Sequence, residues 1–151
     1  MEKQSINPKY QALAIIGVLA LGALFLFWPK PLHQLRQGEV YLEVGEYGYK
    51  AAVARTSEER ARGLSERETL CEDCAMLFVF DTPGLYGFWM KGMRFPLDIL
   101  WIHDSRVVHK ESNVSEKRAD VMKPAVEAEM VLEVNPNPKI QVGDEVQIEE
   151  K

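Results

Sequence analysis

The sequence predicts an all-β fold, a mainly antiparallel barrel or sandwich with one short helix, preceded by a single transmembrane helix. Three observations support this. A run of 17 uncharged, mostly apolar residues lies near the N-terminus. From residue 38 onward, short segments rich in apolar residues alternate with turn sequences that contain Gly, Pro, Asn or Asp. Only one stretch of that region carries helix-capping residues, and many short strands with few helices are typical of sandwiches and barrels.

The apolar run, "ALAIIGVLALGALFLFW", extends from Ala12 to Trp28. At about 1.5 Å per residue, a helix of this length spans roughly 25 Å, near the lower limit for crossing a bilayer. Tyr10 and Trp28 flank the run as interfacial aromatic residues do, and Pro29 would end the helix. A cleaved signal peptide would need a small-residue site in "FLFWPKPLHQ", and a buried helix would be amphipathic. We therefore predict an uncleaved single-pass anchor.

These features divide the chain into a short tail (1–11), the anchor (12–28), a linker (29–37) and the β domain (38–151). Residues 1–37 contain four basic residues and one acidic residue, a net charge of +3; the rest contains 14 basic and 22 acidic residues, a net charge of −8. An acidic domain without a basic stripe predicts no nucleic-acid partner, because such binding depends on neutralising phosphates. The positive charges flanking the span are nearly balanced, but the short tail favours a domain outside the cytoplasm. The predicted localisation is the membrane.

The sequence of the first part of the domain predicts a β-hairpin and a helix. In residues 39–55, the alternating segment "EVYLEV" is followed by the turn "GEYG" and a second strand. The helix is expected from Ser57 to about Arg62. Thr56 and Glu59 have the spacing of a capping box, and Gly63 is a suitable stop.

The remainder of the domain predicts strands separated by the turns "DTPG", "KGMRFP", "HDS", "NPNP" and "VGD". Each predicted strand is only four to seven residues long, as in a sandwich or barrel. These strands are residues 75–80, 86–90, 97–103, 106–112, 129–134 and 144–150.

The segment "FWMKGMRFPLDILWI" (88–102) contains charged residues within the most apolar part of the domain. Apolar residues occupy both faces of the strand 97–103, so both faces are expected to be covered. Asp98 lies at the start of this strand, and a buried carboxylate needs hydrogen-bond donors or a changed protonation state. The candidate cations nearby in the pattern are Lys91, Arg94, Arg62 and Arg55.

The predicted ligand-binding residues are Arg62, Trp89, Lys91 and Asp98. On an extended strand Trp89 and Lys91 share one face, so the ammonium group can lie beside the indole, with the carboxylate opposite. This arrangement suits a small polar ligand. It also describes a structural ion pair at the end of a barrel and an active site, and the spacing leaves all three open.

Cys71 and Cys74 form "CEDC" and are the only cysteines in the chain. We favour a disulfide in a connecting loop, which is consistent with an exported domain. A zinc site would need a second Cys or His pair at suitable spacing, so no metal is predicted. A redox dithiol is a further alternative, but the acidic residues Glu72 and Asp73 disfavour the thiolate that it needs. A cytoplasmic domain with two free thiols also stays open.

Signatures of common enzyme classes are absent from the sequence. It contains no nucleophile elbow, phosphate-binding loop or metal-binding helix. Glu127, Glu129 and Glu133 could supply paired carboxylates, but such a run of charges beside a strand is usually a solvated face. The sequence therefore predicts no cofactor and does not decide whether the protein is an enzyme.

The blocks "RARGLSERETL", "AMLFVF", "FWMKGMRFPLDILWI", "VLEV" and "VGDEV", in this order, closely resemble the family known as domain of unknown function 192, over roughly residues 38–149. The resemblance implies a small β-barrel domain, often behind a signal or anchor, with no settled activity. The positions that match its pattern are Arg60, Arg67, Trp89, Lys91, Asp98, Glu133 and Asp144.

Three departures from the family pattern bear on ligand binding. Ser65 stands where the family has Met, Gly92-Met93 replaces Asn-Thr, and Ala75 replaces Gly. The second change removes two polar groups. A ligand that contacts those groups in relatives would therefore be bound differently here, or not at all.

We expect a membrane-anchored, extracytoplasmic β-barrel module that binds a small polar ligand or acts as an accessory domain. Two alternatives remain open from the sequence. The first is a cell-envelope hydrolase that uses Asp98 as acid or base. The second is a structural domain that docks onto a membrane partner.

Overall fold

The computed structural model describes residues 38–149. The predicted tail, anchor and linker lie outside the described residues, so the anchor stays a prediction. Within residues 38–149 the structure contains no helix with the length and apolar character needed to cross a membrane.

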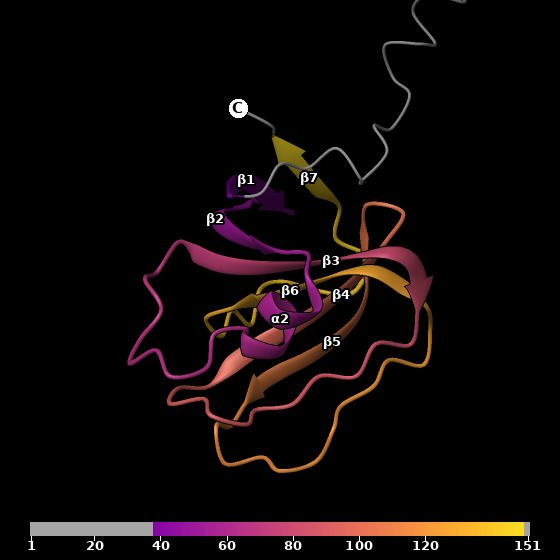
Figure 1. The fold of residues 1–151 in the computed structure, drawn as a ribbon. Helices are drawn as coiled ribbons and strands as arrows, with labels where there is room; N and C mark the ends of the chain where they lie inside the picture. Colours follow the sequence, from indigo (N-terminus) through magenta and orange to yellow (C-terminus); the bar gives the residue numbers. More distant parts are fainter. Residues whose placement is uncertain (1–37, 150–151) are drawn as a thin grey trace, which may run out of the picture. The chain divides into compact units, whose positions relative to one another are not determined.

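The described chain is all-β with one short helix, as predicted (Figure 1). The helix α2 comprises Ser57–Arg62. The strands are β1 (Glu39–Val44), β2 (Tyr47–Ala54), β3 (Cys74–Gly84), β4 (Leu97–His103), β5 (Arg106–Val114), β6 (Ala128–Val134) and β7 (Val146–Glu149).

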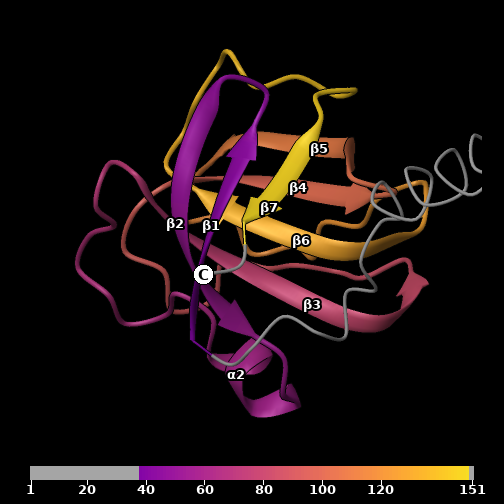
Figure 2. The same cartoon turned by 90° about the horizontal axis from the view of Figure 1, so that it is seen from above.

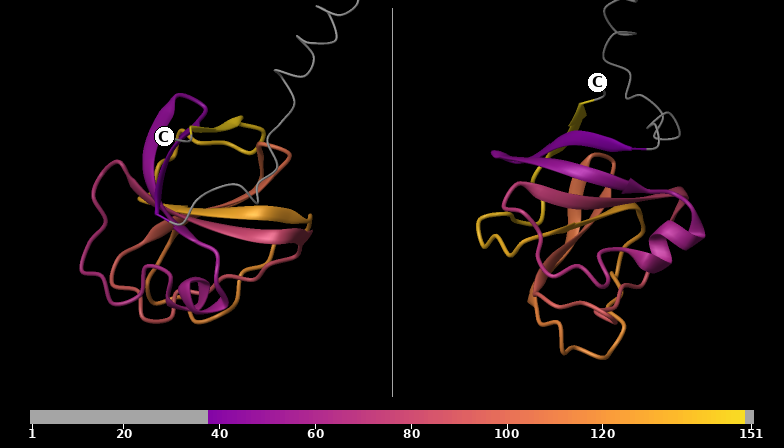
Figure 3. Two further views of the ribbon diagram at one scale, coloured as in Figure 1. Left: turned by 45° about the horizontal axis from the view of Figure 1, so that its top comes forward. Right: turned by 60° about the vertical axis from the view of Figure 1, so that its left-hand side comes forward.

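The strands form one sheet in the order β5-β4-β6-β3-β2-β1-β7 (Figure 2). All pairings are antiparallel except β2 with β3, which are parallel and joined by the segment that contains α2. The sheet curls into a half-barrel, so that β1, β2 and β7 face the other strands (Figure 3). The start of edge strand β5 meets the start of edge strand β7. There Val107 N donates to Asp144 O at 3.0 Å, and Val146 N donates to Ser105 O at 2.8 Å.

The prediction of a strand at residues 86–90 is wrong. Phe88 makes a single bridge, exchanging two backbone hydrogen bonds of 2.8 Å with Met122. A further bond, from Trp101 Nε1 to Tyr86 O at 2.8 Å, fixes the segment over the sheet. The segment covers the outer face of the sheet instead of extending its edge. Its apolar residues therefore pack against the sheet, although the segment forms no continuous strand pairing.

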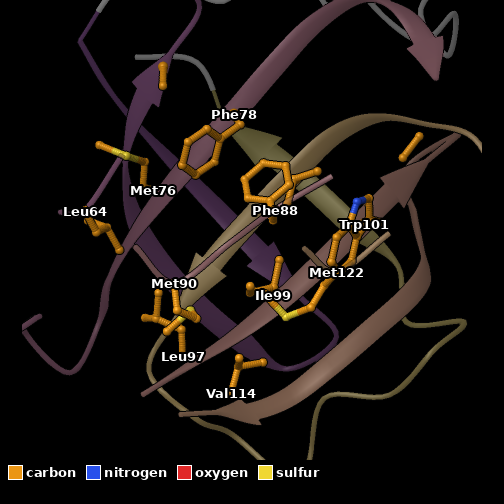
Figure 4. Close-up of a cluster of buried hydrophobic side chains, with 13 residues drawn as sticks. Leu64, Met76, Phe78, Phe88, Met90, Leu97, Ile99, Trp101, Val114 and Met122 are labelled. Atoms are coloured by element: carbon orange, nitrogen blue, oxygen red, sulfur yellow. The ribbon is translucent and has the colours of Figure 1, made fainter. Parts of the chain in front are cut away.

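The predicted strand 97–103 is confirmed as β4, and the expectation that both its faces are covered is also confirmed. β4 is buried from its first to its sixth residue, and β6 is buried throughout. One face lies inside the half-barrel. The other face contacts an apolar cluster beneath the connecting loops, called here the second apolar cluster to distinguish it from the interior of the half-barrel (Figure 4). The second apolar cluster comprises Ala54, Leu64, Met76, Phe78, Phe88, Met90, Leu97, Ile99, Trp101, Val114, Met122, Ala128 and Val131.

The predicted capping box of α2 is present. Thr56 Oγ1 accepts from Glu59 N at 3.1 Å, and Glu59 Oε2 accepts from Thr56 N at 2.9 Å. The helix ends at Gly63, whose φ of +51° favours glycine and whose Cα approaches Phe78 so closely that an added Cβ would lie 3.4 Å from its ring. This close approach places the turn after α2 directly on the second apolar cluster.

Candidate functional site

Asp98 is buried, with 1% of its surface exposed, and both of its carboxylate oxygens accept hydrogen bonds. Its Oδ1 accepts from Asn113 N at 2.6 Å, and its Oδ2 accepts from Asn137 N at 2.9 Å and from Lys110 Nζ at 2.8 Å. The Lys110 ammonium also donates to the carbonyls of Asn137 and Ile140. This is a complete buried ion pair that joins β4, β5 and the loop after β6.

The expectation that Asp98 pairs with Lys91 or a nearby arginine is wrong. Its partner Lys110 lies on β5 opposite Leu100, two residues along β4, so both side chains project from the same face. Lys91 instead lies in an exposed turn, where its backbone carbonyl accepts from Ser65 Oγ at 3.1 Å. Pairing across strands overrides proximity in the sequence.

The four residues predicted to bind a ligand therefore do not lie together. Arg62 and Trp89 line one pocket, whereas Lys91 and Asp98 are not among its residues. Arg62 is exposed and pairs with Glu58 at 3.0 Å, and Trp89 is 48% exposed.

The pocket has a volume of about 240 Å³ and lies between the α2 turn and the segment 86–93, over β3 and β6. Five of its residues are aromatic: Phe78, Phe80, Tyr86, Phe88 and Trp89. The other lining residues are Ser57, Arg60, Ala61, Arg62, Gly63, Leu64, Ser65, Gly87, Met93 and Glu133.

The aromatic walls of the pocket are held by contacts with one another. Phe80 and Tyr86 stack with ring centroids 3.5 Å apart, and Phe78 meets Phe88 edge to face at 4.9 Å. Phe88 in turn contacts the buried Trp101 at 5.8 Å. Rings fixed in this way give the pocket a shape before any ligand arrives.

Glu133 carries the one carboxyl group among the described residues that line this pocket. In β6 it is registered opposite Met76 of β3 and Ile99 of β4, so it projects into the second apolar cluster, and it is only 4% exposed. Within the described residues its Oε2 is buried without a hydrogen-bond partner. Burial raises the pKa of Glu133 to about 8, because an apolar setting disfavours the charged form.

The expectation that Glu129 and Glu133 belong to a solvated face is wrong, because both are buried. Glu129 is satisfied: it is paired with His103 Nδ1, and it accepts from Asp104 N at 2.9 Å. The carboxylate raises the pKa of His103. Atoms of His103, Asp104 and Glu129 that could bind a metal ion lie within 4.8 Å of one another. The ion pair between His103 and Glu129 accounts for this proximity without a metal.

Arg60 places a cation at the edge of the pocket. Its Nη1 donates to the carbonyls of Arg55 and of Val79, the latter at 3.1 Å, and its guanidinium lies 4.9 Å from the centroid of the Phe80 ring. These contacts fix the guanidinium through one nitrogen. Nε and Nη2 have no hydrogen-bond partner among the described residues.

The predicted disulfide between Cys71 and Cys74 is present. It closes the loop that leads into β3. Asn135, the residue after β6, donates from its Nδ2 to the carbonyls of Leu70 and Cys71 at 3.2 Å and 2.9 Å. The disulfide thus stabilises the chain that runs from the pocket wall back into the sheet.

Residues 40–148 match the model of the family domain of unknown function 192, described as an uncharacterized ACR. The chain belongs to this family. Among family positions, Arg60, Trp89 and Glu133 line the pocket, as do Ser65 and Met93, where the chain departs from the family pattern.

Solved structures share the fold. A protein of unknown function from Novosphingobium aromaticivorans is 30% identical, with a TM-score of 0.69 over 72% of this chain and 84% of that one. A protein from Sinorhizobium meliloti described as a "putative transcription regulator" is 21% identical, with a TM-score of 0.70 over 76% of this chain and 97% of that one. At that identity the second likeness shows the fold alone. A comparison with curated proteins gives no match.

Sequence reasoning did not place Glu133 or Arg60 in the predicted site, although both match the family pattern. A signal for Glu133 was present. In "AEMVLEV" the acidic residues interrupt a strand that is otherwise apolar on both faces, which is typical of a buried strand rather than of a solvated one.

Proposed function

We propose that this domain is a binding module for a small ligand, which enters the aromatic pocket and is held there by Glu133. The observation that supports this most strongly is the unpartnered buried carboxyl group in a preformed pocket. A buried polar group left without a partner costs on the order of 1–3 kcal/mol. Groups that carry such a cost are typical of functional sites, where a ligand supplies the missing partner.

The shape and chemistry of the pocket support a compact ligand. Small-molecule sites combine apolar and aromatic walls with a few polar groups that fix orientation, and their volumes are typically about 300–1,000 Å³. At about 240 Å³ this pocket is slightly smaller. The polar side chains among its described lining residues are Glu133, two arginines, two serines, the Tyr86 hydroxyl and the Trp89 indole N–H. A ligand with a small apolar body and one or two polar groups fits this description.

The hydrolase alternative receives little support. A general acid or base must reach a substrate and exchange a proton with it. Asp98 is buried, is paired with Lys110 and accepts hydrogen bonds from two backbone N–H groups, so it has no access to a substrate.

A docking role is favoured by one observation, a shallow groove lined in part by the exposed side chains Val126 and Val142.

A ligand screen against the full chain in a nonionic maltoside detergent tests the binding proposal. Hits are expected to raise the melting temperature. Trp89→Ala should weaken each hit roughly fivefold, because one aromatic contact is worth about 1 kcal/mol. Leu85→Ala is the matched control, since Leu85 is 54% exposed and lies outside the pocket. Equal loss of affinity in both variants, or no hit at all, would count against the pocket.

We further propose that the module is tethered to the membrane with its domain outside the cytoplasm. The apolar run Ala12–Trp28 supports the tether, and a Cys71–Cys74 disulfide is typical of exported proteins.

Protease protection and thiol labelling test this location. Protease is expected to degrade the domain in right-side-out membrane vesicles and to spare it in inverted ones. A maleimide that does not cross membranes should label the chain only after reduction. Cys71→Ser combined with Cys74→Ser is the labelling control. Protection in right-side-out vesicles would exclude this orientation.

A further inference from the structure

We propose that the ligand of the pocket is an organic cation, an ammonium group that bears alkyl substituents. This inference rests on the proposed function and adds the chemical class of the ligand. It follows from the combination of five aromatic residues and one carboxyl group around a single small volume.

The aromatic walls favour a cation over a neutral group of the same size. Aromatic faces carry partial negative charge, and they attract ammonium groups most strongly where water is excluded. The Arg60 guanidinium, 4.9 Å from the Phe80 centroid, shows this attraction within the chain itself. Because Tyr86 also stacks on Phe80 at 3.5 Å, the ligand is left to contact the other lining rings. Phe78 and Phe88 are buried, so a ligand that reaches them loses its water and gains the full attraction.

Glu133 supplies the countercharge that a desolvated cation needs. The carboxyl is buried, and its Oε2 has no partner among the described residues. A purely apolar ligand would leave the group unsatisfied in either protonation state. A bound ammonium group supplies positive charge to the ionised carboxylate and to the aromatic faces at once.

The arginines of the pocket do not compete for this position. Arg62 is exposed and paired with Glu58 at 3.0 Å. Arg60 is fixed by the carbonyls of Arg55 and Val79, against the Phe80 ring. In the described part of the chain, neither guanidinium forms a hydrogen bond or ion pair with Glu133. Any acidic group that the organic cation also carries would find Arg60 at the edge of the pocket.

Binding of a cation changes the protonation of Glu133. The group is largely protonated at neutral pH, since its pKa is raised to about 8 by burial. An ammonium group favours the carboxylate, so the acid O–H bond breaks, its proton passes to solvent, and the carboxylate pairs with the cation. Affinity for a cation therefore rises with pH up to about 8, whereas a neutral hydrogen-bond acceptor would bind less well above that pH.

The other groups near Glu133 would not give the same dependence of cation affinity on pH. The charged and titratable residues that line the pocket with it are Arg60 and Arg62 from the α2 region and Tyr86 from the covering segment. The adjacent strands contribute Met76 and Ile99, which do not titrate. Glu133 is the one carboxyl group among the lining residues.

The test compares choline with 3,3-dimethyl-1-butanol, a neutral molecule of nearly the same shape, by titration calorimetry on the full chain in a nonionic maltoside detergent. Choline is expected to bind roughly tenfold or more tightly. Titrations at neutral pH in buffers of different ionisation enthalpy should show release of part of one proton. Choline affinity should increase from neutral pH toward about pH 8.

Two variants separate a direct role of Glu133 from a structural one. Glu133→Gln keeps the shape, and it should weaken choline binding and abolish proton release. Glu129→Gln, a buried glutamate of the same strand outside the pocket, should retain both. Equal binding of the two probes, or choline binding without proton release, would overturn the cation inference and leave the pocket proposal standing. Binding of neither probe overturns the cation inference, and absence of any hit in the broader screen overturns the proposed function itself.

Discussion

Replacement of Asp98 by asparagine is expected to lower the free energy of unfolding by about 3–5 kcal/mol, because it leaves a buried ammonium group without its countercharge. Lys110 Nζ is 2.8 Å from Asp98 Oδ2, and both side chains are almost fully buried. Lys110→Met should cost a similar amount, since it leaves a buried carboxylate. Urea unfolding, followed by tryptophan fluorescence to which the buried Trp101 contributes, measures both losses.

The double variant Asp98→Asn with Lys110→Met distinguishes the ion pair from general disruption. Neither charge is then buried alone, so the double variant should lose much less than the sum of the single losses. Glu58→Gln is the control. It breaks an exposed pair with Arg62 and should cost less than about 1 kcal/mol. Additive losses in the double variant would show that the two residues do not act as a pair.

Glu133→Gln is expected to make the domain more resistant to unfolding at alkaline pH than the unaltered chain. The pKa of Glu133 rises from 4.5 to about 8 on folding, so between these values the folded state binds a proton that the unfolded state has lost. This contribution to stability is present in full below pH 4.5 and is lost as the pH rises to about 8. At about 1.36 kcal/mol per pKa unit, the full difference is on the order of 5 kcal/mol.

Unfolding free energies of both proteins at pH 5 and pH 9 measure this effect. The difference between the two chains isolates Glu133, because other groups such as His103, whose pKa is also raised, are common to both. Glu149→Gln, an exposed glutamate on β7, should follow the unaltered chain. Parallel pH curves for the Glu133 variant and the unaltered chain would mean that burial does not control this carboxyl.

The elements of the fold were largely predictable because they depend on local chemistry. The capping box at Thr56 and Glu59 and the turn at "GEYG" specify conformation within a few residues. The strand at 97–103 is apolar on both faces over most of its length. Such patterns need no knowledge of distant contacts. The segment 86–90 has a similar composition, but it covers the sheet instead of joining it, and composition does not distinguish these two outcomes.

The candidate site was less predictable because it depends on the register between strands. Lys110, and not Lys91, faces Asp98 because β5 is antiparallel to β4 in one particular alignment. Glu133 becomes a pocket residue because β6 lies between β3 and β4, which places its side chain under the turn after α2. A shift of one residue in either pairing would move these groups to the opposite face.

The sequence by itself predicted the all-β class and the short capped helix and favoured the disulfide, because each depends on local patterns of residue types. Only the tertiary structure decided that Asp98 is sealed in an ion pair and that Glu133 is left without a partner beside five aromatic residues. The physical reason is that burial and pairing of a charge are set by strands distant in the chain, whose alignment maximises apolar contact across the whole sheet.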